Sequence, residues 1–406
     1  MLKLFNSLGK RLETFTPANP EVVTVFTCGP SIYQRAHIGN FRTFLFEDVL
    51  VRYLTYLGYR VKRGMNFTDI EDKAIVEARQ HDLTVRELTD RNIDQFIGEM
   101  KLLGIRIPEY LPRSSDYVGE AAAIVARLIE LGAAYWHKGN VYFDPLKFPG
   151  FGKLYGLDMG RWPVKRRRFH RDTYPGIQWN LGDFILWHGC PSGDEFCRDT
   201  PIGRGRPSWN VQDPSMVASR FQETLSIYCG GIDNLYRHHD YSIAILESVR
   251  PYAMARYWLH GAHLFVQGKK MSKSRGNILY TEGLIDRGYT AAEIRFFLID
   301  GHYREKLFYT DETMATAAHR LRRLRECIRI IAERAGQAKP NADERAARIR
   351  EAFRAAMDDD LAVHGAIAAV QQEVEAAVVA ADSTPRSLSA TIAALREIDA
   401  VLNVLF

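Results

Sequence analysis

Two short segments of this 406-residue chain carry residue types that could hold a nucleotide. The first follows an apolar run at residues 22–26 and ends in His37-Ile38-Gly39-Asn40, which reads as the start of a helix. The second places Lys270 and Lys273 on a loop between Gly268 and Gly276. A helix N-terminus offers unpaired amides and a positive dipole end, and mobile lysines add positive charge. The two segments together predict a polyphosphate held from opposite sides, which is what adenylation requires.

Adenylation assigns a role to each of these side chains. The carboxylate of an acid attacks the α-phosphate of ATP in line, and pyrophosphate leaves. We expect His37, Lys270 and Lys273 to stabilise the charge that builds on the phosphates, with Asn40 beside His37 as the fourth catalytic candidate. The alternative role for His37 is to cap the helix that begins there.

The two segments occur in this order about 230 residues apart. Together with the residues around them, they make the chain resemble the class I aminoacyl-tRNA synthetases, in particular the cysteinyl-tRNA synthetases. The supporting motifs are Thr27-Cys28-Gly29-Pro30, Asn66-Phe67-Thr68-Asp69-Ile70-Glu71-Asp72-Lys73, Gly230-Gly231-Ile232-Asp233, His238-His239 and Gly301-His302-Tyr303-Arg304. The resemblance runs from about residue 20 to the C-terminus. It implies an α/β fold: a Rossmann-like (HUP) doubly wound parallel sheet with an inserted subdomain and a C-terminal helical bundle.

The order of segments along the chain agrees with this architecture. We expect a catalytic domain over residues 1–310, interrupted by an insertion at about 112–205 that is rich in Gly, Pro, Trp and Arg, and a helical bundle over 311–406. Cysteinyl-tRNA synthetases continue into an anticodon-binding domain, and we expect that domain to be absent here. In this respect the chain is similar to the cysteine:glucosaminyl-inositol ligase of mycothiol synthesis, which also carries the Lys-Met-Ser-Lys-Ser-Arg-Gly-Asn form found at 270–277.

The resemblance also implies the residues of each half of the site. The residues implied to bind ATP or the adenylate are Gly29, Pro30, Ser31, Gly39, Gly231, Ile232, Asp233 and Leu264. Those implied to line the aminoacyl end are Cys28, Thr43, Asn66, Phe67, Thr68, Trp209, Asp213 and His238. Asp233 is suited to accept protons from ribose hydroxyls, and the glycines before it permit close backbone approach. The alternative for Trp209 is a place in the core.

The zinc site of the resembling synthetases is altered in this sequence. There, two Cys, one His and one Glu hold a zinc ion that binds the thiolate of the substrate. Cys28 and His238 stand at matching positions, but Asp213 replaces the second Cys and Ser242 replaces the Glu. Either Cys28, Asp213 and His238 still ligate zinc, or the metal is lost and Asp213 with His238 lines a polar pocket for a cationic or hydroxylated side chain. The altered pocket beside conserved nucleotide motifs predicts retained adenylation with a changed acyl specificity.

Three functions are consistent with these features. The first is an ATP- and Mg²⁺-dependent ligase that passes an aminoacyl group, not specifically cysteine, to a small-molecule amine. The second is a short synthetase-like protein that charges a tRNA or a carrier; its support is two basic stretches, residues 165–171 and the arginines of 320–329, which could also be solvated or ion-paired surface. The third is a non-catalytic paralogue that binds the adenylate, against which the intact His37, Lys270 and Lys273 argue.

Composition limits the class of protein. Hydrophobic residues make up 46% and charged residues 25%, which is ordinary for a globular chain, and the net charge of +5 is too small to indicate a nucleic-acid partner by itself. No apolar run approaches the ~20 residues that span a bilayer. The five cysteines show no disulfide framework, so we expect Cys190 and Cys197 to be free thiols and the protein to be cytoplasmic. The sequence leaves monomer and homodimer open.

Overall fold

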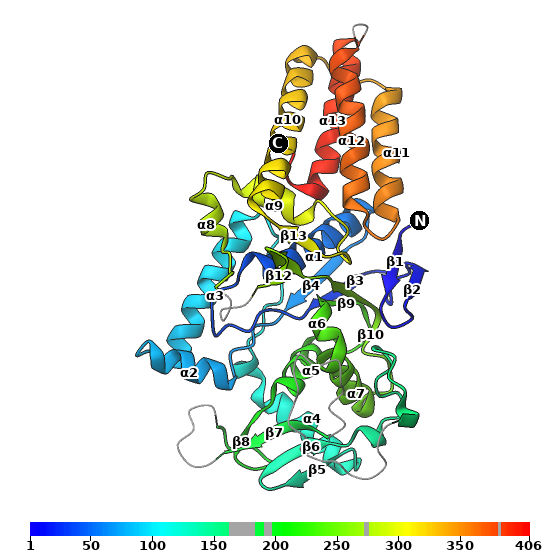
Figure 1. Ribbon diagram of the computed structural model, residues 1–406. Coiled ribbons are helices and arrows are strands. Elements are labelled where there is room, and N and C mark those ends of the chain that lie inside the picture. Colours follow the sequence, from blue (N-terminus) through cyan, green and yellow to red (C-terminus); the bar gives the residue numbers. More distant parts are fainter. Residues whose placement is uncertain (162–182, 191–196, 272–275, 381–382) are drawn as a thin grey trace.

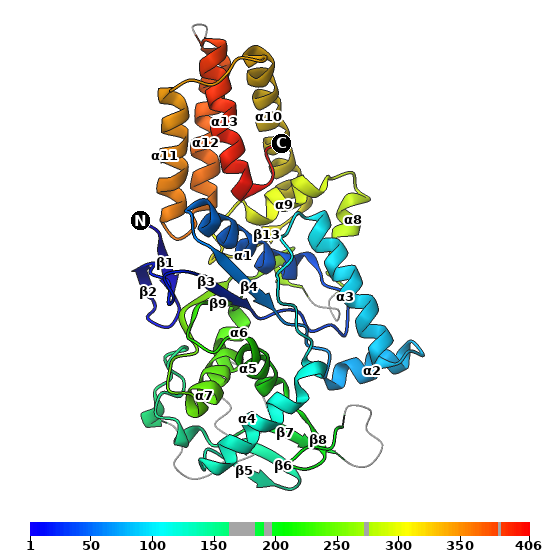
Figure 2. The ribbon, with the colours of Figure 1, turned by 180° about the vertical axis from the view of Figure 1, so that it is seen from behind.

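The computed structural model of the chain describes residues 1–161, 183–190, 197–271, 276–380 and 383–406 (Figure 1). A parallel sheet occupies the middle of the molecule, four long helices extend from one side of it, and a smaller antiparallel sheet lies on the other side (Figures 1 and 2). The predicted α/β fold with a parallel sheet is thereby confirmed.

The parallel sheet has four strands in the order β10-β9-β3-β4. The strands are β3 (Val23–Thr27), β4 (Val61–Met65), β9 (Leu225–Gly231) and β10 (Ala255–Gly261). β3 and β9 are almost entirely buried, as strands are when both faces of a parallel sheet are covered. The chain proceeds from β3 to β4 on one side and adds β9 later on the other side. Ligands bind in open α/β sheets at such a reversal, outside the carboxyl ends of the strands.

Helices connect and cover these strands. They are α1 (Ile38–Tyr56), α2 (Asp72–Gln80), α3 (Val85–Leu102), α5 (Trp209–Arg220), α6 (Ile232–Asn234), a π-helical turn (Leu235–His239) and α7 (Asp240–Val249). The remaining small elements of this part are β1 (Lys3–Asn6), β2 (Arg11–Thr14), β11 (Leu264–Val266), β12 (Lys269–Lys270), α8 (Thr281–Ile285), α9 (Ala291–Ile299) and β13 (Leu307–Tyr309). β12 pairs with β11, which also pairs with β13, so Lys270 lies on a separate sheet with the order β12-β11-β13.

The part between α3 and α5 contains a second sheet, which is antiparallel and has the order β5-β6-β7-β8. Its elements are a 3₁₀ turn (Ser114–Tyr117), α4 (Val118–Glu130), β5 (Ala134–His137), β6 (Asn140–Phe143), two further 3₁₀ turns (Pro145–Lys147 and Met159–Arg161), β7 (Phe184–Gly189) and β8 (Gly205–Pro207). One prediction is wrong here: Cys190 and Cys197 form a disulfide instead of remaining free. β7 and β8 are paired, and Cys190 directly follows β7 while Arg198 bridges to Gly205 of β8, so tertiary pairing brings the two cysteines together.

The C-terminal bundle consists of α10 (Asp311–Ala335), α11 (Glu344–Asp358), α12 (Val363–Val379) and α13 (Pro385–Leu402). A buried charge cluster joins it to the sheet. Arg295 of α9 donates to the carbonyl oxygen of Leu402 at 2.7 Å and pairs with Asp48 of α1 at 2.7 Å. Burial raises the pKa of the Asp48 carboxyl, but the charges of Arg295 and Arg52 outweigh burial and hold the pKa below its usual value. The arginine thus satisfies the carbonyl of the last residue of α13 and ties α13 to α1.

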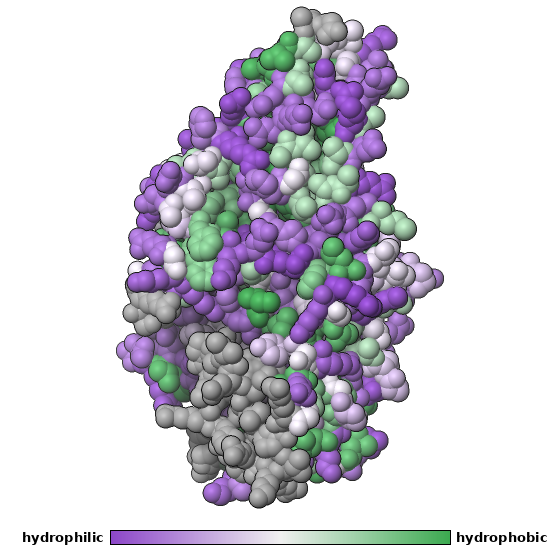
Figure 3. Space-filling view, turned by 45° about the vertical axis from the view of Figure 1, so that its right-hand side comes forward, coloured by the Kyte–Doolittle hydropathy of each residue, from purple (hydrophilic) through white to green (hydrophobic). Residues whose placement is uncertain are grey.

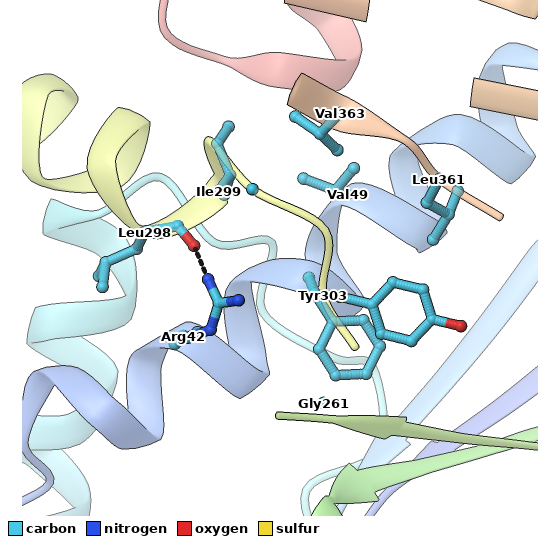
Figure 4. A pocket seen from close by; sticks show the side chains of 10 residues that line it. Arg42, Val49, Gly261, Leu298, Ile299, Tyr303, Leu361 and Val363 are labelled. Carbon is cyan, nitrogen blue, oxygen red and sulfur yellow. Dashed lines mark hydrogen bonds between the residues drawn. The ribbon is translucent and has the colours of Figure 1, made fainter. Parts of the chain in front are cut away.

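A small apolar crevice lies at the same joint (Figure 4). Val363 and Leu361 approach it from the bundle, while Arg42 of α1 donates to the carbonyl oxygen of Leu298 at its edge. Its volume of about 10 Å³ is enough for one water molecule at most. This crevice is therefore a packing defect and not a substrate site.

The outer surface of the bundle is mainly hydrophilic on the face shown in Figure 3. Within the described residues, no helix combines the length and apolar character needed to cross a bilayer.

Candidate active site

The predicted nucleotide residues line one large cleft at the carboxyl ends of β3 and β9. Its volume is about 930 Å³, near the upper end for ligand pockets. The predicted residues in its wall are Cys28, Gly29, Pro30, Ser31, His37, Gly39, Asn40, Thr43, Trp209, Gly231, Asp233, His238, Leu264 and Lys270. Asn66, Phe67, Thr68 and Asp213 lie buried behind the wall, and Ile232 is 41% exposed outside it. Lys273 lies outside the described residues.

His37 caps helix α1 and also faces the cleft. Its Nδ1 accepts a hydrogen bond from the Asn40 amide at 3.3 Å, and the Asn40 side chain accepts from the His37 amide at 3.0 Å. Burial lowers the pKa of His37 to about 4, so its ring is neutral at neutral pH. Because Nδ1 accepts, the ring proton sits on Nε2. His37 can therefore offer one N–H donor to a phosphate oxygen without adding a positive charge.

The two nucleotide motifs touch each other beneath the cleft. A Cβ placed on Gly39 would come within 2.5 Å of Met271 Cε, the methionine that follows Lys270. A side chain at position 39 would force the Met271 methyl group to move, so glycine lets the start of α1 lie against the lysine loop as it stands. Gly29 has a similar role, because its amide donates to Asn66 Oδ1 at 2.8 Å and a side chain there would collide with the Asn66 backbone.

Lys270 and Asp233 form an ion pair across the mouth of the cleft. Lys270 Nζ lies 3.3 Å from Asp233 Oδ2 and 3.2 Å from His263 Nε2. Burial raises the pKa of Asp233, but the charges of His263 and Lys270 outweigh burial and keep the carboxyl ionised. Asp233 is thus a charged acceptor where the ribose hydroxyls are expected. The sequence did not identify His263 as a site residue, because only the fold brings it close to Lys270.

The aminoacyl half of the cleft contains a stacked aromatic pair. The Trp209 ring lies parallel to the His238 ring, with centroids 3.9 Å apart. Trp209 is 41% exposed, so it is a wall of the cleft and not a core residue. Cys28 lies nearby and its sulfur accepts from Asn234 Nδ2 at 3.4 Å. Burial, and then the charge of Asp213, raises the pKa of the Cys28 thiol well above its usual value, so the thiol is protonated without a metal.

Asp213 is enclosed behind this half of the cleft. Its Oδ1 accepts from Asn66 Nδ2 at 2.8 Å, and its Oδ2 accepts from the Tyr228 hydroxyl at 2.9 Å and lies 3.1 Å from His238 Nε2. The residue is fully buried, so its carboxylate does not face a substrate directly. The predicted polar pocket therefore presents the ring of His238, with Asp213 behind it.

Two of the four positions of the family's zinc site carry side chains that are hydrogen-bonded within the protein. Asp213 Oδ2 is shared between Tyr228 and His238, and Ser242 Oγ donates to the His238 carbonyl oxygen at 2.9 Å. Among the described residues, the group able to hold a metal is instead Cys28, His238 and His239. His239 directly follows His238 in the sequence, but adjacency did not identify it because neighbours on a regular helix point in different directions.

The arginines of α10 are engaged within the protein. Their partners are Asp300 for Arg320, Glu293 for Arg322, Glu375 for Arg323, the Val404 carbonyl oxygen for Arg325, and Glu326 with Glu333 for Arg329. This pairing matches the ion-paired interpretation of the second basic stretch. The first, residues 165–171, lies outside the described residues.

Comparisons with known proteins identify the family of the chain. Residues 14–319 match the family model described as tRNA synthetases class I (C) catalytic domain. A cysteine--tRNA ligase of Chlamydia pneumoniae is 34% identical over 100% of this chain and 86% of its own length. One from Cyanothece sp. is 34% identical over 90% of this chain and 77% of its own length.

Solved structures show the same fold at low sequence identity. A Mycobacterium tuberculosis methionyl-tRNA synthetase bound by methionyl-adenylate is 14% identical, with a TM-score of 0.66 over 96% of this chain and 92% of the other. An Agrobacterium radiobacter K84 LeuRS is 13% identical, with a TM-score of 0.69 over 96% of this chain and 84% of the other. The chain is an aminoacyl-adenylate-forming ligase that belongs to the cysteinyl-tRNA synthetase family of class I aminoacyl-tRNA synthetases.

Proposed function

We propose that this ligase activates an amino acid other than cysteine and transfers the aminoacyl group to a small-molecule amine. ATP, which the family uses together with Mg²⁺, supplies the adenylyl group. A carboxylate oxygen of the acid bonds to the α-phosphorus as the bond to pyrophosphate breaks. The amine nitrogen then bonds to the acyl carbon as the bond to AMP breaks and the amine loses a proton, which leaves an amide.

His37, Lys270 and the N-terminus of α1 carry the first step. The Nε2–H of His37 and the first amides of α1 can donate to phosphate oxygens from one side, while Lys270 adds charge from the other. Lys270 is 46% exposed and its ammonium group contacts Asp233 and His263 at the cleft mouth, so it can exchange Asp233 for a phosphate. Asp233 is then released to accept from the ribose.

The environment of Asp213 is the observation that carries the proposed change in acyl specificity. A buried carboxylate held by Asn66 and Tyr228 occupies the place of a thiolate that helps the family bind cysteine. Replacing a soft, metal-binding sulfur by a carboxylate that is already hydrogen-bonded removes part of the basis for recognising a thiol side chain.

Two carboxylates in the lining of the cleft, Glu71 and Asp183, support an amine as the acceptor. Lys73 also lines the cleft and lies over the Tyr33 ring at 5.2 Å. Carboxylates favour a cationic amine and disfavour the phosphates of a nucleic acid. The ion pairs made by the arginines of α10 also argue against a nucleic acid as the acceptor.

Charging of a tRNA is the second candidate, because the relatives at 33–38% identity are named cysteine--tRNA ligases. Pyrophosphate exchange across a panel of amino acids, without tRNA, tests the acyl preference. We expect exchange with one or a few acids that are not cysteine. Cysteine as the best substrate would refute the proposed specificity.

A second assay follows the labelled acyl group in the presence of a panel of primary amines or of total tRNA. We expect a saturable, amine-dependent amide product. Label on tRNA would refute the proposed acceptor. Asp213→Cys restores the family's residue and should improve exchange with cysteine, whereas Asp213→Asn serves as the matched control that alters charge without adding a sulfur.

A further inference from the structure

One motif of the sequence, Gly301-His302-Tyr303-Arg304, lies outside the wall of the cleft. It belongs to the loop between α9 and β13, at residues 301–306, and borders the apolar crevice at the joint with the bundle (Figure 4). Its side chains converge on Asp360, a residue of the turn between α11 and α12 that is only 2% exposed. Buried polar groups are hydrogen-bonded, so the contacts of this carboxylate show what the motif does.

The Asp360 carboxylate is hydrogen-bonded through both of its oxygens. Oδ1 accepts from the Tyr303 hydroxyl at 2.8 Å and from the Phe5 amide of β1 at 2.7 Å. Oδ2 accepts from Arg304 Nε at 2.6 Å and lies 3.4 Å from His302 Nε2. His302 Nδ1 accepts from the Arg304 amide at 3.2 Å, which leaves the ring proton on Nε2, facing the carboxylate. Three successive side chains of the loop are therefore held by one residue of the bundle.

The turn that carries Asp360 has an unfavourable backbone conformation. Asp360 has a φ of 53° and Leu361 a φ of 57°, although neither is glycine. Such conformations are uncommon for residues with a side chain, and they persist where surrounding contacts determine them. The Asp360 amide donates to the Lys3 carbonyl oxygen at 3.0 Å, and Leu361 lines the crevice together with Tyr303 (Figure 4). The distorted turn thus presents the carboxylate to the loop.

The loop in turn holds helix α1. Arg42 of α1 is 4% exposed, and its Nη2 donates to the carbonyl oxygens of His302 at 3.1 Å and Glu305 at 2.7 Å. Phe46, one turn further along α1, stacks on the Tyr303 ring with the centroids 4.8 Å apart. The loop therefore fixes the position of the helix whose N-terminus lines the cleft.

The loop also holds the backbone beside Lys270. The Ala262 amide donates to the Tyr303 carbonyl oxygen at 2.8 Å, and the Leu307 amide donates to the His263 carbonyl oxygen at 3.2 Å. These two hydrogen bonds flank His263, whose Nε2 lies 3.2 Å from Lys270 Nζ. One loop thus supports both the helix on one side of the proposed triphosphate site and the lysine on the other side.

We propose that Asp360 is a positioning residue for adenylation. From the bundle it fixes the loop at residues 301–306, and the loop fixes the start of α1 and Lys270 relative to each other. Reacting groups must be held in an aligned geometry by the residues behind them, and a displacement of about 1 Å costs roughly 10²-fold in rate. The proposal rests on the role proposed for Lys270 in the first step, but not on the identity of the acid or of the acceptor.

Asp360→Asn in the full-length chain tests this role. The asparagine oxygen still accepts from Tyr303 and Phe5, but its amide group cannot accept from Arg304 Nε. We expect kcat for pyrophosphate exchange to fall by about 10–100-fold with little change in the KM for ATP, because alignment matters most in the transition state. The assay uses the amino acid that wild type exchanges best, at a saturating concentration.

Asp358→Asn is the matched control for lost stability. Asp358 is the last residue of α11, accepts from the Tyr53 hydroxyl at 2.8 Å and lies 3.0 Å from the Met1 amino group. Its replacement weakens the contact between the bundle and the far end of α1, so urea unfolding should show destabilisation while kcat stays unchanged. Equal losses of kcat in the two variants would show that Asp360 acts only on stability and would overturn the proposal.

Hydrogen exchange of the Ala262 and Leu307 amides follows the loop directly. Both amides should exchange faster in Asp360→Asn than in wild type and should be unchanged in Asp358→Asn. Unchanged protection of both amides in Asp360→Asn would contradict the proposed route through the loop.

Two further variants keep the proposal open to refutation. If Asp360→Asn fails to fold, Tyr303→Phe decides, because it removes the hydroxyl alone and keeps the ring on Phe46: a lower kcat supports the proposal, and the wild-type kcat overturns it. Wild-type exchange in Lys270→Ala would refute the role of Lys270 and this proposal with it. A slow Lys270→Ala beside an Asp360→Asn of wild-type rate overturns this proposal alone.

Discussion

The double role of His37 makes it the sharpest test of the active site. His37→Asn separates the two roles, because asparagine is a good helix N-cap but is too short to place a donor where His37 Nε2 lies. The cap is retained, so we expect the free energy of unfolding to change by less than about 0.5 kcal/mol. Loss of one donor to a developing phosphate charge should slow adenylation by about 10²–10³-fold, or roughly 3–4 kcal/mol.

The pKa of His37 limits this magnitude. Burial lowers it to about 4, so the substitution removes a neutral donor and no positive charge near neutral pH. Pyrophosphate exchange at saturating ATP measures the rate, and urea unfolding measures the stability. His37→Ala is the control: it loses donor and cap together, so it should show the same rate loss plus about 1 kcal/mol of destabilisation. An exchange rate for His37→Asn within about threefold of wild type would refute the catalytic role and leave only the cap.

Three further outcomes follow from the same geometry. Lys270→Ala should slow exchange by about 10²–10³-fold with little change in stability, since Lys270 is 46% exposed. Lys269→Ala, on the same strand, should leave the exchange rate unchanged. Equal rates for the two variants would contradict the role of Lys270. Burial raises the pKa of Glu47 to about 7, so its neutral form stabilises the fold below about pH 4.5, and that contribution is lost as the pH rises through 7. The free energy of unfolding of wild type, measured relative to Glu47→Gln, should therefore fall by about 3 kcal/mol over this range. A difference that does not change with pH would refute the shift. Because Arg323 and Arg329 are ion-paired, the double glutamine variant should leave tRNA affinity and its salt dependence unchanged in a filter-binding assay, whereas a loss above about fivefold would show that this face contacts phosphates.

Much of the nucleotide site could be predicted from sequence because it depends on local structure. His37 and Asn40, which cap α1, and Gly39 between them act within one turn of the helix, so their types and spacing are informative by themselves. The aminoacyl end was less predictable. Asn66 and Asp213 are 147 residues apart, and only the fold shows that they bond to each other behind the wall instead of lining it.

The remaining differences also arise from long-range contacts. The disulfide depends on the pairing of β7 with β8 and on the bridge from Arg198 to Gly205, which bring Cys190, directly after β7, close to Cys197. Asp360 bonds to Tyr303, 57 residues before it in the sequence, only because the bundle packs against the sheet. Neither feature has a sequence period or spacing that would predict it.

The amino-acid sequence by itself therefore determined the family, the parallel-sheet fold and the residue types that we propose to bind the triphosphate, because helix starts, glycines and lysine loops carry that information over a few residues. The tertiary structure alone decided which polar side chains face the cleft and which are hydrogen-bonded to one another. The physical reason is that a buried carboxylate or imidazole takes its role from the partners that satisfy it, and those partners come from distant parts of the chain.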